Sequence, residues 1–168
     1  MKKIFLAMCA LVALCACNDE DPIPVSQAVL DSFRARFPEV SNVTWQSSGG
    51  YLVADFYLYD SGQPEECLAW FTPVGEWYMT QREMLYANLP AAVRASFESG
   101  DYATWLVDDV IKVERASSVE YVISADGYYL GVESDAYLYY SEGGVLMRSV
   151  IDPDDYPYWV INEKVRLL

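Results

Sequence analysis

The chain has 168 residues, with 25 Asp and Glu against 11 Lys and Arg, a formal net charge of -14 and no histidine. This acidity argues against nucleic acid as a partner, because binding a phosphate backbone needs a basic stripe that displaces counterions. Without histidine the usual general base, the commonest zinc ligand and the Ser-His and Cys-His nucleophile pairs are missing, so we expect a protein that is not an enzyme and holds no cofactor.

The first 17 residues have the organisation of an export signal. A basic start with two lysines precedes an uncharged apolar stretch, residues 4–14, which has the length of a signal-peptide core and is too short to span a membrane. The stretch leads into Leu-Cys-Ala-Cys at residues 14–17, which resembles the bacterial lipobox. Residues 1–16 are therefore predicted to be a lipoprotein signal peptide, and Cys17 is predicted to be the lipid attachment site. The alternative is an ordinary signal peptide that happens to contain cysteines.

Residues 17–24 form an acidic and then proline-containing segment that cannot bury apolar surface, so we expect an extended tether. The segment resembles the acidic export signal that follows the lipidated cysteine in surface-exposed lipoproteins of some anaerobic Gram-negative bacteria. A solvated linker without such a signal is the alternative. The chain is thus expected in the cell envelope as an outer-membrane lipoprotein, on the periplasmic side or at the cell surface.

Few residues are left for disulfide, metal or acid-base chemistry in the mature chain. Once the signal is removed and Cys17 is acylated, Cys67 is the remaining thiol, and its apolar surroundings predict a small buried residue rather than a reactive one. We expect no metal site, because the acidic turns at Asp108 and Asp109 and at residues 152–155 lack the alternating ligands and glycine of an EF-hand loop. A carboxylate-pair glycosidase would need two placed acids, and no pair stands out from the acidic background.

Two segments have helical periodicity. The first covers residues 25–37 and is stopped by Pro38; the second covers residues 89–97, with Pro90 in its first turn, and is ended by Gly100. Their apolar stripes consist of Val25, Val29, Leu30, Phe33 and Phe37 in the first and Leu89, Val93 and Phe97 in the second. The two segments align at a shift of 64 residues, so we expect an internal repeat.

After each helix the hydrophobic period changes to two, which is typical of strands. The predicted strands cover residues 43–46, 51–59, 65–71 and 77–82 in the first half and residues 110–115, 119–124, 128–133, 136–140 and 145–150 in the second. Gly, Ser, Asp and Pro punctuate the strands, including an Asp-Gly turn expected at residues 126–127. A shift of 69 aligns Gly75 with Gly144 and residues 70–71 with 139–140, so the second connection from helix to strands is longer than the first.

The order of a helix followed by a meander, occurring twice, is accompanied by a set of short motifs. They are Phe-Arg-Ala-Arg-Phe-Pro at residues 33–38, Val-Thr-Trp at 43–45, Gly-Gly-Tyr at 49–51 and Ala-Trp-Phe at 69–71, before a glycine turn. The pattern resembles the tandem PepSY-like families, whose fold is compared with the β-lactamase inhibitor protein.

The resemblance implies an α+β fold in which a tandem repeat of a short helix and an antiparallel meander forms one sheet with the helices on one face. The tandem domain would cover residues 25–152, with repeats at about 25–84 and 85–152. Two departures from the pattern are present. The second repeat lacks the aromatic-Pro helix ending, and the C-terminal extension, residues 153–168, has no counterpart in the repeat.

Alternation along residues 51–59 separates two faces of the sheet. The set expected to face the helices is Leu52, Ala54, Phe56 and Leu58, joined by Cys67, Ala69, Phe71, Ala136, Leu138 and Tyr140. The opposite face would carry Tyr51, Tyr57, Tyr59, Trp70, Tyr137 and Tyr139, which we expect to be exposed and to bind the partner. The alternative is that these rings flank a second core layer or are covered by the C-terminal segment at residues 156–161.

Two classes of function are compatible with these features. The first, which the resemblance favours, is a lipid-anchored, non-enzymatic envelope protein that binds a protein partner in the manner of an inhibitor. The second is a surface carbohydrate-binding lipoprotein, since aromatic side chains also stack on sugar rings. A wide concave patch would indicate a protein partner, whereas a narrow groove with two coplanar rings would indicate a glycan.

Overall fold

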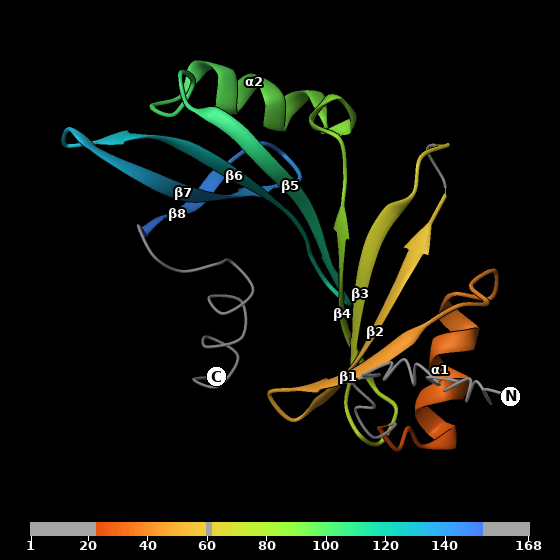
Figure 1. Ribbon diagram of the computed structural model, residues 1–168. Helices are drawn as coiled ribbons and strands as arrows, with labels where there is room; N and C mark the ends of the chain where they lie inside the picture. Colours follow the sequence, from red (N-terminus) through yellow and green to blue (C-terminus); the bar gives the residue numbers. More distant parts are fainter. Residues whose placement is uncertain (1–22, 60–61, 153–168) are drawn as a thin grey trace, which may run out of the picture.

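The computed structural model describes residues 23–59 and 62–152, which form an eight-stranded antiparallel sheet and two α-helices (Figure 1). Each strand pairs with the next one along the chain. The strands are β1 (Thr44–Ser48), β2 (Tyr51–Leu58), β3 (Glu65–Phe71), β4 (Trp77–Glu83), β5 (Leu106–Arg115), β6 (Val119–Tyr129), β7 (Val132–Ser141) and β8 (Leu146–Asp152). The helix α1 (Gln27–Arg36) precedes β1, and a short 3-10 turn, η1 (Tyr86–Asn88), leads into α2 (Ala91–Ser99) before β5. The predicted signal peptide, most of the tether and the C-terminal extension lie outside the described residues.

Both helices form where the sequence predicts them. The backbone N–H of Val29 donates to the Ser26 side chain at 3.4 Å, which caps the start of α1. Two arginines lie in the last turn, where their positive charge interacts favourably with the helix dipole. In α2, Pro90 occupies the N-cap position and Gly100 the C-cap position. The predicted stripes are the buried sides of the helices: Val29 and Phe33 in α1, Val93 and Phe97 in α2.

The strands of the first half agree with the prediction within two residues at each end, but the second half has four strands rather than five. The strand predicted at residues 128–133 is wrong, because β6 continues through the expected Asp-Gly turn. The chain reverses instead at Leu130 and Gly131, whose φ angles are 52° and 81°. Gly127 lies within β6, where a side chain would collide with the Trp105 ring. The glycine therefore marks a close packing contact and not a turn.

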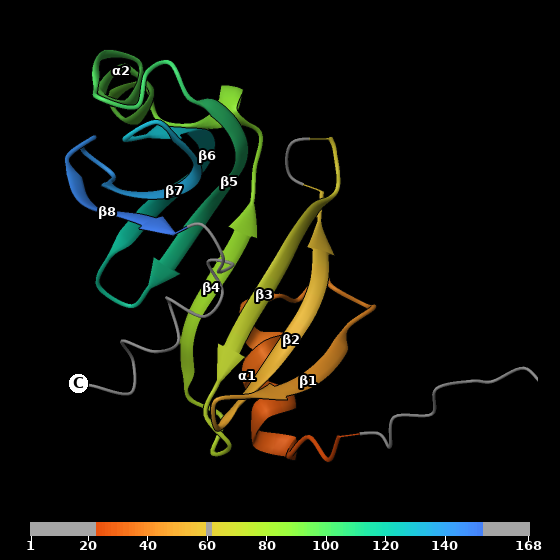
Figure 2. The ribbon, with the colours of Figure 1, turned by 60° about the vertical axis from the view of Figure 1, so that its left-hand side comes forward.

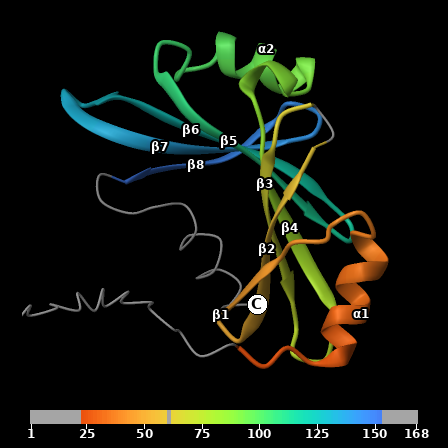
Figure 3. The same ribbon diagram turned by 45° about the vertical axis from the view of Figure 1, so that its right-hand side comes forward.

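The two helices lie on the same face of a strongly twisted sheet, each over its own half (Figures 1 and 3). The helix α1 packs on a cluster that includes Phe56, Cys67 and Phe71, and α2 packs on a cluster that includes Ile123 and Leu138. Cys67 is fully buried, as predicted. The β-strands of the two halves run in clearly different directions, so the helix-free face is concave around the junction of β4 and β5 (Figure 2).

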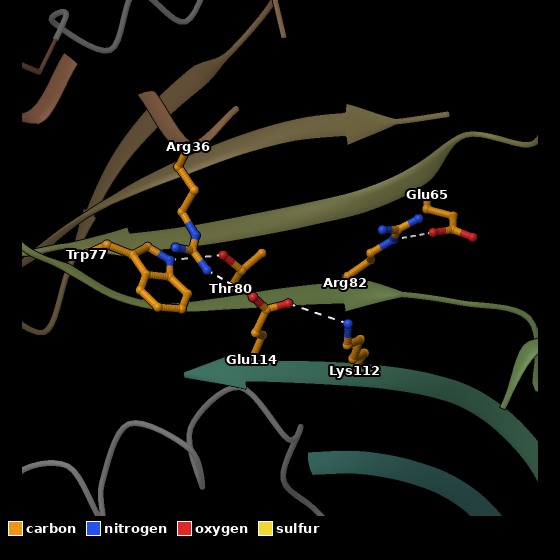
Figure 4. A network of polar contacts seen from close by, with 7 residues as sticks. All are labelled: Arg36, Glu65, Trp77, Thr80, Arg82, Lys112 and Glu114. Atoms are coloured by element: carbon orange, nitrogen blue, oxygen red, sulfur yellow. Dashed lines mark hydrogen bonds and ion pairs between the residues drawn. The ribbon is translucent and has the colours of Figure 1, made fainter. Parts of the chain in front are cut away.

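A polar network on the helix side connects the two halves across β4 (Figure 4). The Arg36 guanidinium, at the end of α1, lies over the Trp77 ring at 3.2 Å from its centroid and forms an ion pair of 2.9 Å with Glu114 of β5. Glu114 also contacts the Lys112 ammonium at 3.4 Å, and the Trp77 indole N–H donates to the Thr80 hydroxyl at 3.0 Å. These contacts are only partly exposed, and they hold α1 of the first half to β5 of the second.

Candidate functional site

The two faces of the sheet are divided as alternation predicts. Ala54 and Phe56, with the predicted members of the neighbouring strands, pack under the helices, whereas Val53 and Trp70 point to the opposite face. In the second half, Ala136, Leu138 and Tyr140 pack beneath α2. Of the predicted aromatic set, Tyr51, Trp70, Tyr137 and Tyr139 pack in the cluster on the face opposite the helices, as expected.

The expected exposure is wrong for half of the aromatic set. Trp70 and Tyr137 are 4% exposed and Tyr139 is 3% exposed, so they form a second core cluster with Val53, Met79, Ile111, Val113 and Val122. The twist of the sheet is the reason, because it brings both halves of the concave face together and buries large rings that a flat sheet would leave in water. Burial raises the pKa of Tyr139, and the Arg148 guanidinium lies 3.7 Å from the centroid of its ring.

The other three aromatic residues keep contact with solvent. Tyr51 is partly buried against Tyr78, with the two ring centroids 5.1 Å apart. Tyr57 is 50% exposed and Tyr59 is 68% exposed. Tyr57 and Tyr59 lie at the end of β2, beyond the buried centre of the concave face. They are the members of the predicted set that a partner could reach directly.

Several buried polar atoms of the second core cluster and its surroundings have no hydrogen-bond partner among the described residues. They are the indole nitrogen of Trp70, the hydroxyl of Tyr139 and both side-chain amide atoms of Gln81. Gln81 is 3% exposed and lies two residues after Met79 in β4. Residues two apart in a strand share a face, so Gln81 also points into the concave face. Such groups are costly to bury unpaired, so this face has hydrogen-bonding capacity that the described fold does not use.

One end of the sheet carries a row of acidic side chains, which we call the acidic end. In an antiparallel meander, the last residues of β2, β4 and β6 and the first residues of β3, β5 and β7 meet at the same end. The acidic end consists of Asp55, Glu66, Glu83, Asp108, Asp109, Asp126, Glu133 and Asp135. None of these carboxylates forms an ion pair with another described residue.

The carboxylates of the acidic end influence one another's ionisation. The pKa of Glu83 is raised by burial and by the nearby Glu66 and Asp109. The pKa of Asp109 is raised by burial and by Asp108, and the negative charge of Glu66 is the largest cause of a raised pKa at Tyr57. The row therefore concentrates negative charge beside the exposed Tyr57 of β2.

A hollow of about 480 Å³ opens at the acidic end, between the two halves of the sheet. The pairing of β4 with β5 ends at Glu83 and Ile111. After one more backbone hydrogen bond, from the Met84 N–H to the Val110 carbonyl, the two strands separate at an irregularity in β5, and the hollow forms there. Glu83, Asp108 and Asp109 line the hollow together with apolar side chains, of which Leu85 and Leu106 are largely exposed. The hollow combines negative charge with apolar surface.

The sequence identified only part of this surface. Tyr57 and Tyr59 are in the predicted binding set. The acidic turn predicted at Asp108 and Asp109 is wrong, because both residues lie within β5, at its irregularity. Glu66, Gln81 and Glu83 were not predicted as part of a binding surface. The spacing of two residues from the buried Met79 to Gln81 and on to Glu83 could have placed both on the concave face. Within the described residues, no three His, Cys, Asp or Glu side chains are grouped closely enough to hold a metal ion.

In the part of the chain that the structure describes, neither α-helix is long and apolar enough to cross a membrane. A search of the curated proteins finds no match. Similar solved structures come from Bacteroides species. A BLIP-like protein (similar to the β-lactamase inhibitor protein) of Bacteroides fragilis is 31% identical, with a TM-score of 0.69, over 80% of this chain and 91% of that one. A DUF2874 family protein of Bacteroides ovatus is 27% identical, with a TM-score of 0.71, over 80% and 92% of the two chains.

A third structure, a candidate periplasmic protein of Bacteroides eggerthii, has a TM-score of 0.70 over 81% of this chain and 95% of that one. At 21% identity it supports the fold alone. The family model described as "Putative beta-lactamase-inhibitor-like, PepSY-like" matches residues 57–148. Because that match covers more than half of the chain and the Bacteroides fragilis structure agrees in sequence and in fold, this protein belongs to the PepSY-like family and has the BLIP-like fold.

Proposed function

We propose that this chain is a lipid-anchored, non-enzymatic protein of the cell envelope that binds a protein partner at the acidic end of its sheet. The observation that carries the proposal is the placement of two exposed tyrosines, Tyr57 and Tyr59, at the end of the sheet where a row of carboxylates forms no ion pair with a described residue. Exposed aromatic side chains act as rigid anchors in interfaces, and complementary charge steers association. The inhibitor-like description of the matching family model supports this function.

The partner contact can be tested in cells by placing a photo-cross-linking amino acid at Tyr59 of the full chain. We expect a discrete cross-linked protein, because this side chain projects beside the proposed interface. Glu39 is the control position, since it is exposed in the turn after α1 and is not one of the residues of the acidic end. Replacing Tyr57 with alanine should abolish most of the product, because interface anchors contribute about 2 kcal/mol or more. Equal products from both positions, or a product that a glycan-degrading enzyme removes, would contradict a specific protein contact.

The lipid anchor gives a second prediction. Cys17 should carry the lipid, because the lipobox-like residues 14–17 place the processing site there. The intact mass of the membrane-extracted protein should correspond to a chain that starts at Cys17 with its acyl groups attached. Replacing Cys17 with serine should move the protein out of the membrane fraction. An unmodified Cys17, or a retained residue 1, would show that the segment is not a lipoprotein signal.

We also infer that the two halves of the sheet are repeats of one helix-plus-meander unit. Two local features of the backbone, a turn and a pairing irregularity, recur at the predicted shift of 69 residues. The β3–β4 and β7–β8 turns have the same hydrogen bonds, from Gly75 N–H to the Thr72 carbonyl and from Gly144 N–H to the Ser141 carbonyl, each 2.9 Å. A pairing irregularity occurs after Trp70 in β3 and after Tyr139 in β7.

A further inference from the structure

A small recess lies on the concave face where β3, β4 and β5 approach the acidic end. It is bordered by Glu66, Leu68, Gln81, Arg82, Glu83 and Ile111. Its volume is about 10 Å³, which is close to the space that one water molecule or one small polar group needs. The recess therefore accepts the tip of a side chain and not a ring or a sugar.

The floor of the recess offers hydrogen bonds that nothing in the described fold uses. Gln81 is 3% exposed, and both its amide oxygen and its amide nitrogen lack a partner. A buried amide in this state costs stability, because it has lost its water without gaining another partner. The oxygen of Gln81 is thus available to accept a hydrogen bond from a group that enters the recess.

The rim of the recess carries negative charge without a described counter-ion. Glu66 and Glu83 face each other across β3 and β4, and neither forms an ion pair with a described residue. Arg82 also borders the recess, but its guanidinium forms an ion pair with Glu65 (Figure 4). The pKa of Glu83 is raised by burial, by Glu66 and by Asp109. Two neighbouring carboxylates repel each other, so a cation bound between them would be stabilised.

The walls of the recess are apolar. Leu68 is opposite Gln81 in the pairing of β3 with β4, and Ile111 is opposite Glu83 in the pairing of β4 with β5. An occupant that satisfies all three features needs a hydrocarbon stem, a compact positive charge and hydrogen-bond donors. The side chain of lysine has this composition, with an apolar four-carbon stem and three donors on a point charge, whereas the planar guanidinium of arginine is too wide for so small a recess.

We propose that this recess binds the ammonium group of a lysine side chain presented by the protein partner, held by Glu66, Glu83 and the amide oxygen of Gln81. The inference rests on the partner-binding function proposed above and states which chemical group the partner must supply. A lysine would stack its stem on Leu68 and Ile111 and would neutralise two carboxylates that form no ion pair with a described residue.

Nuclear magnetic resonance of the full-length protein in detergent tests this assignment with a lysine that is capped at both backbone ends. We expect saturable shifts of the Gln81 side-chain amide signals at low salt, and their suppression at about 1 M salt, where exposed charges are screened. The same compound acetylated on its side-chain nitrogen should give no saturable shift, because it keeps the stem but loses the charge.

Variants complete the test. Glu83→Gln should weaken binding of the capped lysine about tenfold or more, because it removes one of the two charges. Its fold should be kept, since glutamine has nearly the same size and shape as glutamate, and the substitution removes a negative charge that burial, Glu66 and Asp109 disfavour. Glu39→Gln removes the same charge at an exposed position that does not border the recess and should leave binding unchanged.

Equal shifts with the charged and the acetylated compound, no shift with either, or full binding by Glu83→Gln would overturn the lysine assignment. The outcome is separate from that of the cross-linking experiment, because a partner could still be captured at Tyr59 without inserting a lysine here. A cross-linked partner together with a silent recess would therefore reject the lysine site and leave the partner-binding function in place.

Discussion

Replacing Trp70 with alanine is expected to destabilise the protein by about 3 to 5 kcal/mol, as much as a similar truncation in the core beneath the helices. Trp70 is 4% exposed and packs among buried residues of both halves of the sheet. Its removal would leave a cavity that cannot close easily, because strands on both sides of the concave face line it. Denaturant unfolding of Trp70→Ala beside Phe56→Ala gives the measurement, with Phe56 as the reference core residue under α1.

Two further variants make the result specific. Tyr57→Ala should cost little stability, because its ring is half exposed at the end of the same face. Trp70→Phe should recover much of the loss, since it keeps an aromatic ring and removes an indole N–H that has no described partner. If Trp70→Ala were as mild as Tyr57→Ala, the centre of the concave face would be open to solvent, and the wider aromatic patch predicted from the sequence would again be the candidate interface.

Local signals in the sequence predict the elements of this fold well. Both helices were predicted from their apolar periodicity and their stop residues, Pro38 and Gly100, and both have the expected buried stripes. The four strands of the first half were predicted because glycine and proline turns separate clear alternating runs. These signals act over only a few residues, so they can be read without knowledge of the tertiary fold.

The wrong strand, predicted at residues 128–133, has a tertiary cause. Asp126 and Gly127 have the composition of a tight turn, but the glycine is needed for contact with Trp105, which comes from the segment before β5. The true turn contains Leu130, a residue that rarely adopts a positive φ. Neither fact can be read from the strand itself, because the glycine is explained by a residue more than twenty positions away.

The depth of burial of the side chains on the concave face could not be predicted from the sequence either. Alternation predicts which face a side chain points to, and it was correct for Trp70 and Tyr139, but it does not say whether that face is open. The answer depends on the twist that accumulates over eight strands and brings Val53 of β2 into the same cluster as Tyr139 of β7. The same twist places Gln81 in a closed environment, which turns an ordinary polar residue into a candidate binding group.

The turn glycines provide the second large effect. Gly144 has a φ of 82°, and a Cβ atom at this position would lie 2.7 Å from the backbone carbon of Ala92 in α2. Gly75 is related in the same way to α1, where its Cβ would lie 2.8 Å from the backbone oxygen of Ala28. In each half, therefore, the turn between the third and fourth strands touches the helix backbone so closely that only glycine fits.

Gly144→Ala is expected to destabilise the protein by more than about 2 kcal/mol, because it adds a backbone collision with α2 to the strain of a positive φ. Gly131 is a matched control: its φ is 81°, but nothing lies within 4 Å of its Cβ position. Gly131→Ala should therefore show the conformational cost alone, about 1 to 2 kcal/mol. Thermal and denaturant unfolding of the two variants measures the difference, which isolates the contact between α2 and the β7–β8 turn. Equal losses in the two variants would mean that the helix can move away from the turn at no cost, and that the close contact does not fix α2 on its half of the sheet.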